Sequence, residues 1–184
     1  LAIVALIFGS ALFAQWREYD QPLAARGEFH FVRMEYEDLP GLRRPWGRGW
    51  WMQDMPEAEM HFAQGIRRLT RIHIGEPKHF PFRDDRIFDY PWIYATQVGY
   101  WALNAEETER MRAYFQRGGF LVVDDFYGEQ DWSAFAQSMA RVLPGQTIVD
   151  MHENPDVLRV LYEIKERTFI PGLRHLRRGT SGLV

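Results

Sequence analysis

The sequence contains no cysteine among its 184 residues. Disulfide bonds, thiolate metal sites and cysteine nucleophiles are therefore excluded. Basic residues are not in excess either, because 22 Lys and Arg stand against 25 Asp and Glu, which gives a formal net charge of −3. A nucleic-acid-binding protein normally carries a basic surplus that displaces counterions from phosphates. Nucleic acid is therefore not an expected partner.

Motifs that would indicate a familiar enzyme class are also missing. None of the serines lies in a G-x-S-x-G motif, and the sequence has no phosphate-binding loop, G-x-G-x-x-G or H-E-x-x-H. The carboxylates of the segment 124–131 do not follow the calcium-loop pattern. We therefore expect no cofactor and no metal site, although these carboxylates leave a weak divalent-cation site open.

Aromatic residues, by contrast, are abundant. Seven Trp, eight Tyr and thirteen Phe make up 15% of the chain, which is more than a core of this size usually needs. Some of the rings are therefore expected to line a surface or a pocket.

The first residues are strongly apolar. Residues 1–14 combine an apolar run with small residues, which resembles the h-region and cleavage zone of a secretory signal. We interpret them as a partial signal peptide or membrane anchor and 15–28 as a linker, so the protein is expected to be exported, periplasmic or membrane-associated. A buried first strand is the alternative. We assign 29–178 to a single domain and 179–184 to a tail.

The pattern along 29–178 alternates between strands and amphipathic helices. Asp54 and Glu57 have the spacing of a capping box for the first helix, and Asn104 is expected to cap the second. The continuously apolar 120–123 is typical of a central strand covered on both faces. The predicted strands are 29–36, 72–74, 91–96, 120–123 and 147–149. The predicted helices are 55–71, one from Asn104 to about Gly118, 131–143, and an amphipathic piece after Asn154.

This alternation with short connections predicts an α/β fold, with three layers and a mostly parallel sheet flanked by helices, as in flavodoxin-like proteins. In such sheets, ligands bind beyond the carboxyl ends of the strands. The loops after 29–36, 91–96 and 120–123 are therefore the places to search. Their candidate ligand-binding residues are Trp46, Arg48, Trp51, Asp54, Tyr100 and Trp101. Their candidate catalytic residues are Asp124, Asp125 and Glu129.

Each candidate also has a purely structural interpretation. A tryptophan-rich loop such as 46–51 more often anchors itself on the core than forms a sugar-binding platform. Asp124 and Asp125 are adjacent, and successive side chains of a strand face opposite ways. We therefore expect only one of the two carboxylates to point at a pocket.

The runs IFDYPWIYATQVGYW and RGGFLVVDDFYGE, together with WWMQDMPEAEMHF upstream and RTFIPGLRHLRRG downstream, resemble the bacterial domain-of-unknown-function family 4159. The resemblance implies a distant relationship to class I glutamine amidotransferase-like and trehalose-utilisation-like folds. It also implies exported or membrane-associated proteins without an established activity. Members continue past the end of this chain, which implies that the last strands of the fold are missing here. Glutaminase chemistry does not carry over, because it needs a cysteine nucleophile.

Two functions remain, and we favour the first. The chain is expected to be a non-catalytic module that binds a small polar ligand or an envelope protein partner. The alternative is a carboxylate-dependent hydrolase acting on a glycan or another polar substrate, with paired carboxylates as acid and base. A purely structural part of an envelope assembly is a weaker third reading.

Overall fold

The computed structural model describes residues 27–42 and 47–149. The predicted signal segment, most of the linker, Trp46 and everything after residue 149 lie outside the described residues. In these two described stretches, four parallel strands form one sheet in the order β2-β1-β3-β4. The strands are β1 (Val32–Glu35), β2 (Lys78–Pro81), β3 (Trp92–Thr96) and β4 (Phe120–Asp124). This order is the flavodoxin-like one, so the α/β prediction is confirmed.

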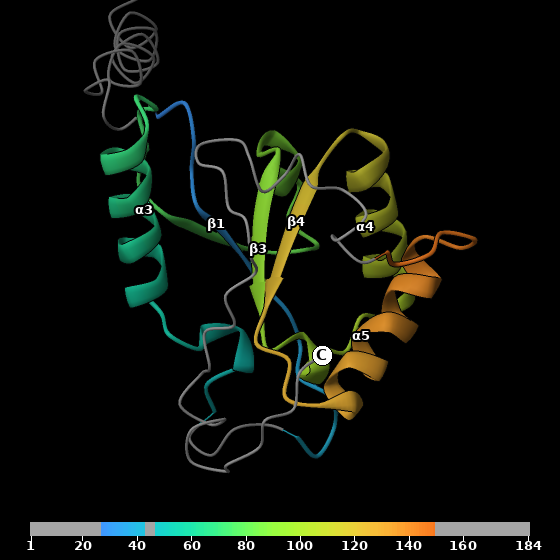
Figure 1. Cartoon of the computed structure of the whole chain (residues 1–184). Helices are drawn as coiled ribbons and strands as arrows, with labels where there is room; N and C mark the ends of the chain where they lie inside the picture. Colours follow the sequence, from blue (N-terminus) through green and yellow to red (C-terminus); the bar gives the residue numbers. More distant parts are fainter. Residues whose placement is uncertain (1–26, 43–46, 150–184) are drawn as a thin grey trace, which may run out of the picture.

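The helices α3, α4 and α5 of the described chain cover the two faces of the sheet and complete a three-layer architecture. Helix α3 (Glu57–Leu69) lies on one side, whereas α4 (Ala105–Gln116) and α5 (Glu129–Val142) lie on the other (Figure 1). Short 3-10 helices precede α3 and follow β2 and β3: η1 (Trp50–Met52), η2 (Asp85–Asp89) and η3 (Val98–Tyr100). Within the described residues, no helix combines the length and apolar character needed to cross a membrane.

Alternation along the strands divides the side chains between the two faces. On the α4–α5 side, Val32, Met34, Ile93 and Ala95 are completely buried in the main core. On the α3 side, Phe31 packs against Phe62 of α3, with ring centroids 5.4 Å apart. Strand β3 carries apolar or aromatic side chains on both faces, and Phe31, directly before β1, joins the aromatic cluster on the α3 side, so the sheet is held between two layers of helices.

Helix α4 begins as its sequence predicts. The Asn104 side chain accepts a hydrogen bond from the Glu107 N–H at 2.9 Å, and the Glu107 carboxylate accepts one from the Asn104 N–H at 3.1 Å. These reciprocal bonds satisfy two of the N–H groups that a helix start leaves without partners. The helix ends near Gly118, whose φ of 87° is a left-handed conformation that suits glycine.

Several predicted elements differ in the structure. Helix α3 begins at Glu57, and Pro56 rather than Asp54 precedes it without a side-chain cap, so the predicted capping box is wrong. Residues 72–74 contribute only an isolated bridge from Ile74 to Phe29. Residues 147–149 form no strand. The predicted strand 29–36 shortens to β1, and β2 was not predicted.

Strand β4 is not the central strand that its apolar sequence predicts. It pairs with β3 and is the outermost strand of the sheet in residues 27–42 and 47–149. Phe120 is 60% exposed, and the next three residues are only partly buried. An apolar run of this kind is compatible with an edge strand that is partly buried as well as with a central strand that is buried on both faces. The periodicity of the sequence does not distinguish these two positions.

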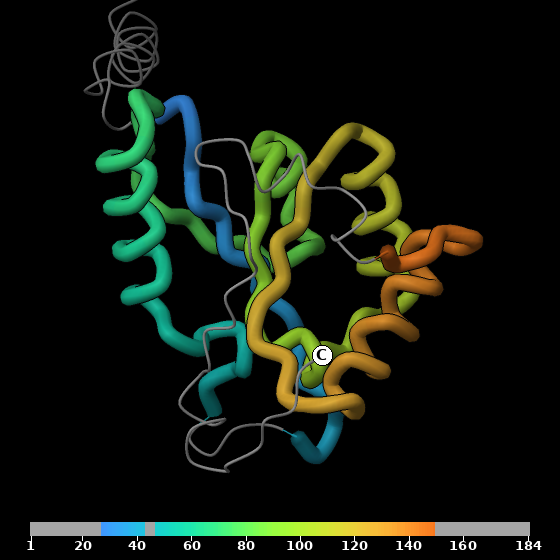
Figure 2. Tube along the Cα trace, viewed as in Figure 1, coloured from blue at the N-terminus to red at the C-terminus, as the bar shows by residue number. Residues whose placement is uncertain are grey.

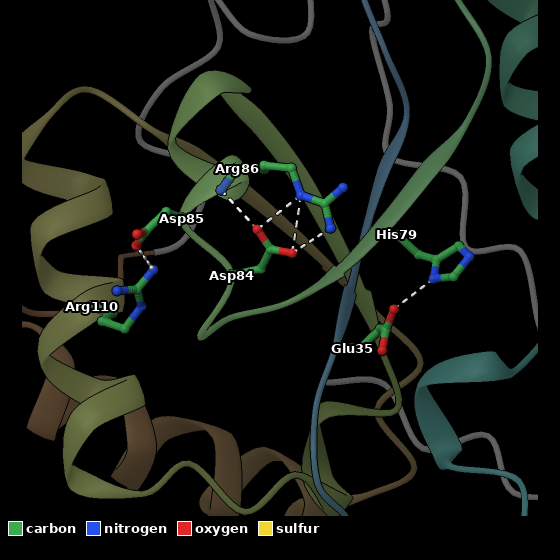
Figure 3. Close-up of polar contacts among 6 residues, drawn as sticks. All are labelled: Glu35, His79, Asp84, Asp85, Arg86 and Arg110. Carbon is green, nitrogen blue, oxygen red and sulfur yellow. Dashed lines mark hydrogen bonds and ion pairs between the residues drawn. The ribbon is translucent and has the colours of Figure 1, made fainter.

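Surface ion pairs hold the turn between β2 and η2. Arg86 donates to both carboxylate oxygens of Asp84, and Arg110 of α4 donates to Asp85 Oδ1 at 2.9 Å (Figure 3). The Arg86 side chain holds the pKa of the Asp84 carboxyl at about 2, below its ordinary value of 3.8. Because this pKa is lowered, the pair stabilises the fold above pH 3.8 and loses that effect as the pH falls toward 2.

Candidate functional site

The carboxyl ends of β1, β3 and β4 point toward the same edge of the sheet, where the loops that follow them gather (Figures 1 and 2). The loops after β1 and β3 are bonded to each other. The Leu39 N–H donates to the Tyr100 carbonyl at 2.7 Å, and the Ala102 N–H donates to the Glu37 carbonyl at 2.7 Å. The Trp50 and Tyr100 rings stack with their centroids 4.5 Å apart.

The loop after β3 is bonded to the loop after β4 as well. The Gln97 N–H donates to the Asp124 carbonyl at 3.1 Å, and Gln97 Nε2 donates to Asp125 Oδ2 at 3.0 Å. All three loops singled out in the sequence therefore meet at one edge, with the loop after β3 between the other two.

Backbone strain is concentrated at this same edge. Three non-glycine residues have a positive φ in the described chain, namely Asp54 (55°), Gln97 (55°) and Asp125 (64°), and one belongs to each of the three loops. Such conformations cost free energy and persist only where their surroundings enforce them, and they cluster at functional sites. The strain therefore marks this edge, and not the opposite one, as the place to look for function.

A pocket of about 210 Å³ opens in the loop after β1. Its position agrees with the strand order, because β2 is added on one side of β1 and β3 on the other, and open parallel sheets bind ligands in the crevice at such a switch point. Tyr36 lies at this point and donates its hydroxyl to the Thr96 carbonyl at 2.7 Å and to the Gln97 carbonyl at 3.0 Å. The pocket is lined by Tyr36, Glu37, Asp38, Gly47, Arg48, Gly49 and Trp51.

The wall of the pocket is built around Trp51. Its ring stacks on His79 of β2 with a centroid separation of 5.8 Å, and His79 Nδ1 lies 2.6 Å from Glu35 Oε1 (Figure 3). Gly49 allows the ring to lie close to the backbone, since a Cβ at that position would be 2.6 Å from Trp51 Cδ1. A glycine at position 49 therefore leaves the space that the Trp51 indole occupies.

The adjacent carboxylates after β4 have structural hydrogen-bond partners. Asp124 Oδ2 accepts from the Tyr94 hydroxyl at 3.2 Å, and its Oδ1 accepts from the Asp125 N–H at 2.7 Å. Asp125 accepts from Thr96 Oγ1 and Gln97 Nε2 on one oxygen and from the Tyr127 hydroxyl on the other. Neither carboxylate is among the residues that line the pocket after β1.

Tyr94 supplies the donor to Asp124 over the whole physiological range. Burial raises the pKa of the Tyr94 hydroxyl well above its ordinary value, and the nearby Asp124 carboxylate raises that pKa further. Burial disfavours the phenolate, and a neighbouring negative charge disfavours it again. Tyr94 therefore remains protonated and acts as a fixed hydrogen-bond donor.

The structure separates the predicted ligand-binding residues into three groups. Arg48 and Trp51 line the pocket. Tyr100 stacks on Trp50, and Asp54 is exposed and accepts from Gln53 Nε2 at 2.6 Å. Trp101 is only 2% exposed and donates Nε1 to Ser138 at 3.1 Å, so its ring belongs to the core. Glu129, a candidate catalytic residue, is exposed at the start of α5.

Sequence reasoning missed Tyr36, Glu37 and Asp38 of the pocket. A signal was available, because Tyr36 ends the strand pattern 29–36 and Glu37 and Asp38 directly follow it, where the same rule that selected the later loop residues applies. In the described part of the chain, no group of three or more His, Asp or Glu is placed to hold a metal ion.

Comparisons with known proteins agree with the resemblance in the sequence. No curated protein matches the chain. A family model described as "Domain of unknown function (DUF4159)" matches residues 30–180, which include every element of the sheet and the whole edge described above. The chain therefore belongs to this family of unknown function.

Proposed function

We propose that this domain is a non-catalytic binding module for a small polyhydroxylated ligand of about the size of a hexopyranose, held in the pocket after β1. The observation that carries the proposal is the position of that pocket at the switch point between β1 and β3. Its volume of about 210 Å³ is below the roughly 300–1,000 Å³ of pockets for drug-sized molecules. A small ligand is therefore favoured.

The chemistry of the lining supports a ligand with several hydroxyl groups. Trp51 offers an aromatic surface, Glu37 and Asp38 bring carboxylate acceptors, and Arg48 brings a planar set of donors. Hydroxyl groups both donate and accept, so one ligand of this type can use all of these partners. Arg48 would favour a ligand that also carries a negative charge.

The contacts after β4 make the alternative, a carboxylate-dependent hydrolase, less favourable. A general acid or a nucleophile needs an oxygen that can reach the substrate. Neither Asp124 nor Asp125 lines the pocket after β1, and their oxygens accept hydrogen bonds from groups of the turn and of β3. These bonds hold the turn after β4 in its strained conformation, which is a structural task.

Isothermal titration calorimetry with three matched probes tests the proposal. Glucose, glucuronate and glucosamine share a ring and differ in charge, and we expect saturable one-to-one binding of at least one of them. Arg48→Ala and Glu37→Gln should each weaken that binding by about tenfold, the loss of roughly one charge-assisted hydrogen bond. Arg67→Ala, which removes an exposed cation from α3, should leave it unchanged.

Two outcomes of these measurements contradict the proposal. One is the absence of saturable binding with all three probes. The other is multiple turnover of a 4-nitrophenyl glycoside that disappears in Asp124→Asn or Asp125→Asn, which would favour the hydrolase.

We also propose that the module works outside the cytoplasm, in the periplasm or at the membrane, where an envelope protein could be a further partner. The apolar segment 1–14 supports this placement. Fractionation of bacterial cells that produce the full-length protein should recover it with periplasmic or membrane markers. Recovery with a cytosolic marker would contradict the export proposal without affecting the binding proposal.

A further inference from the structure

Arg33, in the middle of β1, is completely buried although it carries a charge. Its Nε donates to Glu59 of α3, which is 2% exposed. Its Nη1 donates to two carbonyl oxygens of the segment before α3, those of Trp51 at 2.9 Å and Gln53 at 3.0 Å. One guanidinium therefore joins the sheet, helix α3 and the wall of the pocket.

This buried pair is a poor means of stabilising a core. Removing two charges from water costs several kcal/mol for each ion, and the attraction between them offsets this only when the remaining donors and acceptors are also satisfied. Arg33 Nη2 and Glu59 Oε2 have no hydrogen-bond partner in the part of the chain that the structure describes. Apolar residues of similar volume would pack there at a lower cost, so stability alone does not account for the pair.

The pair does provide orientation. Arginine presents several donors in a fixed plane, so one carboxylate on Nε determines where the others point. Glu59 fixes the orientation of the Arg33 guanidinium plane. The Tyr94 ring, whose centroid is 5.0 Å from Arg33 Cζ, packs against this guanidinium and restricts its movement. The Nη1 donor is then directed at the Trp51 and Gln53 carbonyls.

Trp51 is thereby fixed at both its backbone and its ring. Arg33 donates a hydrogen bond to the Trp51 carbonyl, while the His79 ring and the Gly49 backbone pack against the Trp51 indole and restrict its position. We infer that Arg33 is a positioning residue of the binding site, which holds the Trp51 ring as the wall of the pocket, and that Glu59 orients Arg33 for this task. The inference deepens the proposed function and rests on it for its connection to a ligand.

The double variant Arg33→Met/Glu59→Leu separates positioning from stability. It replaces both charges with apolar groups and should stay folded, with a thermal midpoint near that of the parent protein. Labelling with 5-fluorotryptophan gives each tryptophan its own ¹⁹F resonance, which is assigned from the corresponding Trp→Phe variant. We expect the Trp51 resonance of the double variant to broaden and to show a larger shift between H₂O and D₂O. The Trp101 resonance, which reports on the core, should be unchanged.

A Trp51 resonance with the parent's linewidth and solvent shift in the folded double variant would overturn the inference. Gly49→Ala serves as the positive control, because it displaces the indole directly and leaves the Arg33 contacts in place. If the double variant fails to fold, Arg33→Lys replaces it, since lysine keeps the charge and lacks the planar set of donors. An unchanged Trp51 resonance in that variant would overturn the inference in the same way.

These spectra need no ligand, so they test the positioning role even if the proposed function fails. If a probe does bind the parent protein, the folded double variant should bind it about tenfold more weakly or not at all. Unchanged affinity together with a displaced Trp51 would leave the positioning role standing and would show that the ligand does not contact this ring.

Discussion

Replacing Glu59 with leucine alone is expected to lower the free energy of unfolding by about 3–5 kcal/mol, as measured by urea denaturation. The change leaves the guanidinium of Arg33 buried without a counter-charge, and Arg33 has no exposed surface through which water could solvate it. Arg33→Met should cost a similar amount, because the Glu59 carboxylate is then left uncompensated.

Two controls belong to this prediction. Glu57→Leu changes an exposed glutamate in the same turn of α3 and should cost less than about 1 kcal/mol. Combining the two buried changes should restore most of the lost stability, because neither charge remains buried alone. If Glu59→Leu proves no more costly than Glu57→Leu, the pair is not buried as the structure describes.

Asp125→Ala should lower the free energy of unfolding by about 3 kcal/mol, as measured by urea denaturation. The Gln97 amide, which is 1% exposed, would lose the acceptor for its Nε2, and Thr96 Oγ1 and the Tyr127 hydroxyl would lose theirs. A buried donor left without a partner costs about 1–3 kcal/mol. Alanine at a φ of 64° adds strain that aspartate tolerates better.

Asn at the same position is the informative comparison. Asp125→Asn keeps an acceptor oxygen and suits a left-handed backbone, so it should cost about 1 kcal/mol. Asp124→Ala should also cost less than Asp125→Ala, because Asp124 is exposed and accepts from one side chain, that of Tyr94. A fully stable Asp125→Ala protein would contradict the structural role, and loss of glycoside turnover in it would favour the hydrolase.

Local signals predicted the elements that they control. The reciprocal Asn104–Glu107 pair fixes the start of α4, and the apolar runs of β3 and β4 are found as strands. Strand β2 gave no such signal, because its sequence Lys-His-Phe-Pro lacks apolar alternation and ends in proline. It forms because the neighbouring β1 offers a parallel ladder, which is a tertiary cause.

Two of the incorrect predictions, the strand 147–149 and the central position of β4, share one physical origin. Residues 147–149 have strand-forming side chains but no strand beside them in the described chain, and Ile148 and Val149 are 49% and 66% exposed. Strand propensity largely measures how well a residue packs against neighbours, so without a neighbour it predicts little. The prediction that β4 is a central strand failed for the same reason, because an apolar run does not reveal whether a further strand pairs with it.

The sequence was sufficient to predict which edge of the sheet carries the candidate site, but not which side chains contact one another there. The rule for parallel sheets selected the three loops that meet, including Arg48 and Trp51 of the pocket. It could not distinguish Trp51 from Trp101, because both follow strands and only packing buries the second. Nor could it select Arg33, since an arginine within a strand ordinarily indicates an exposed position.

The response of individual tryptophans to glucose, glucuronate and glucosamine tests the central claim most directly. In the 5-fluorotryptophan protein, we predict that the ¹⁹F resonance of Trp51 shifts saturably with at least one of these probes, while that of Trp132 beside the turn after β4 stays in place. Saturable movement of the Trp132 resonance with Trp51 unaffected, or no movement of either, would contradict a binding site in the pocket after β1.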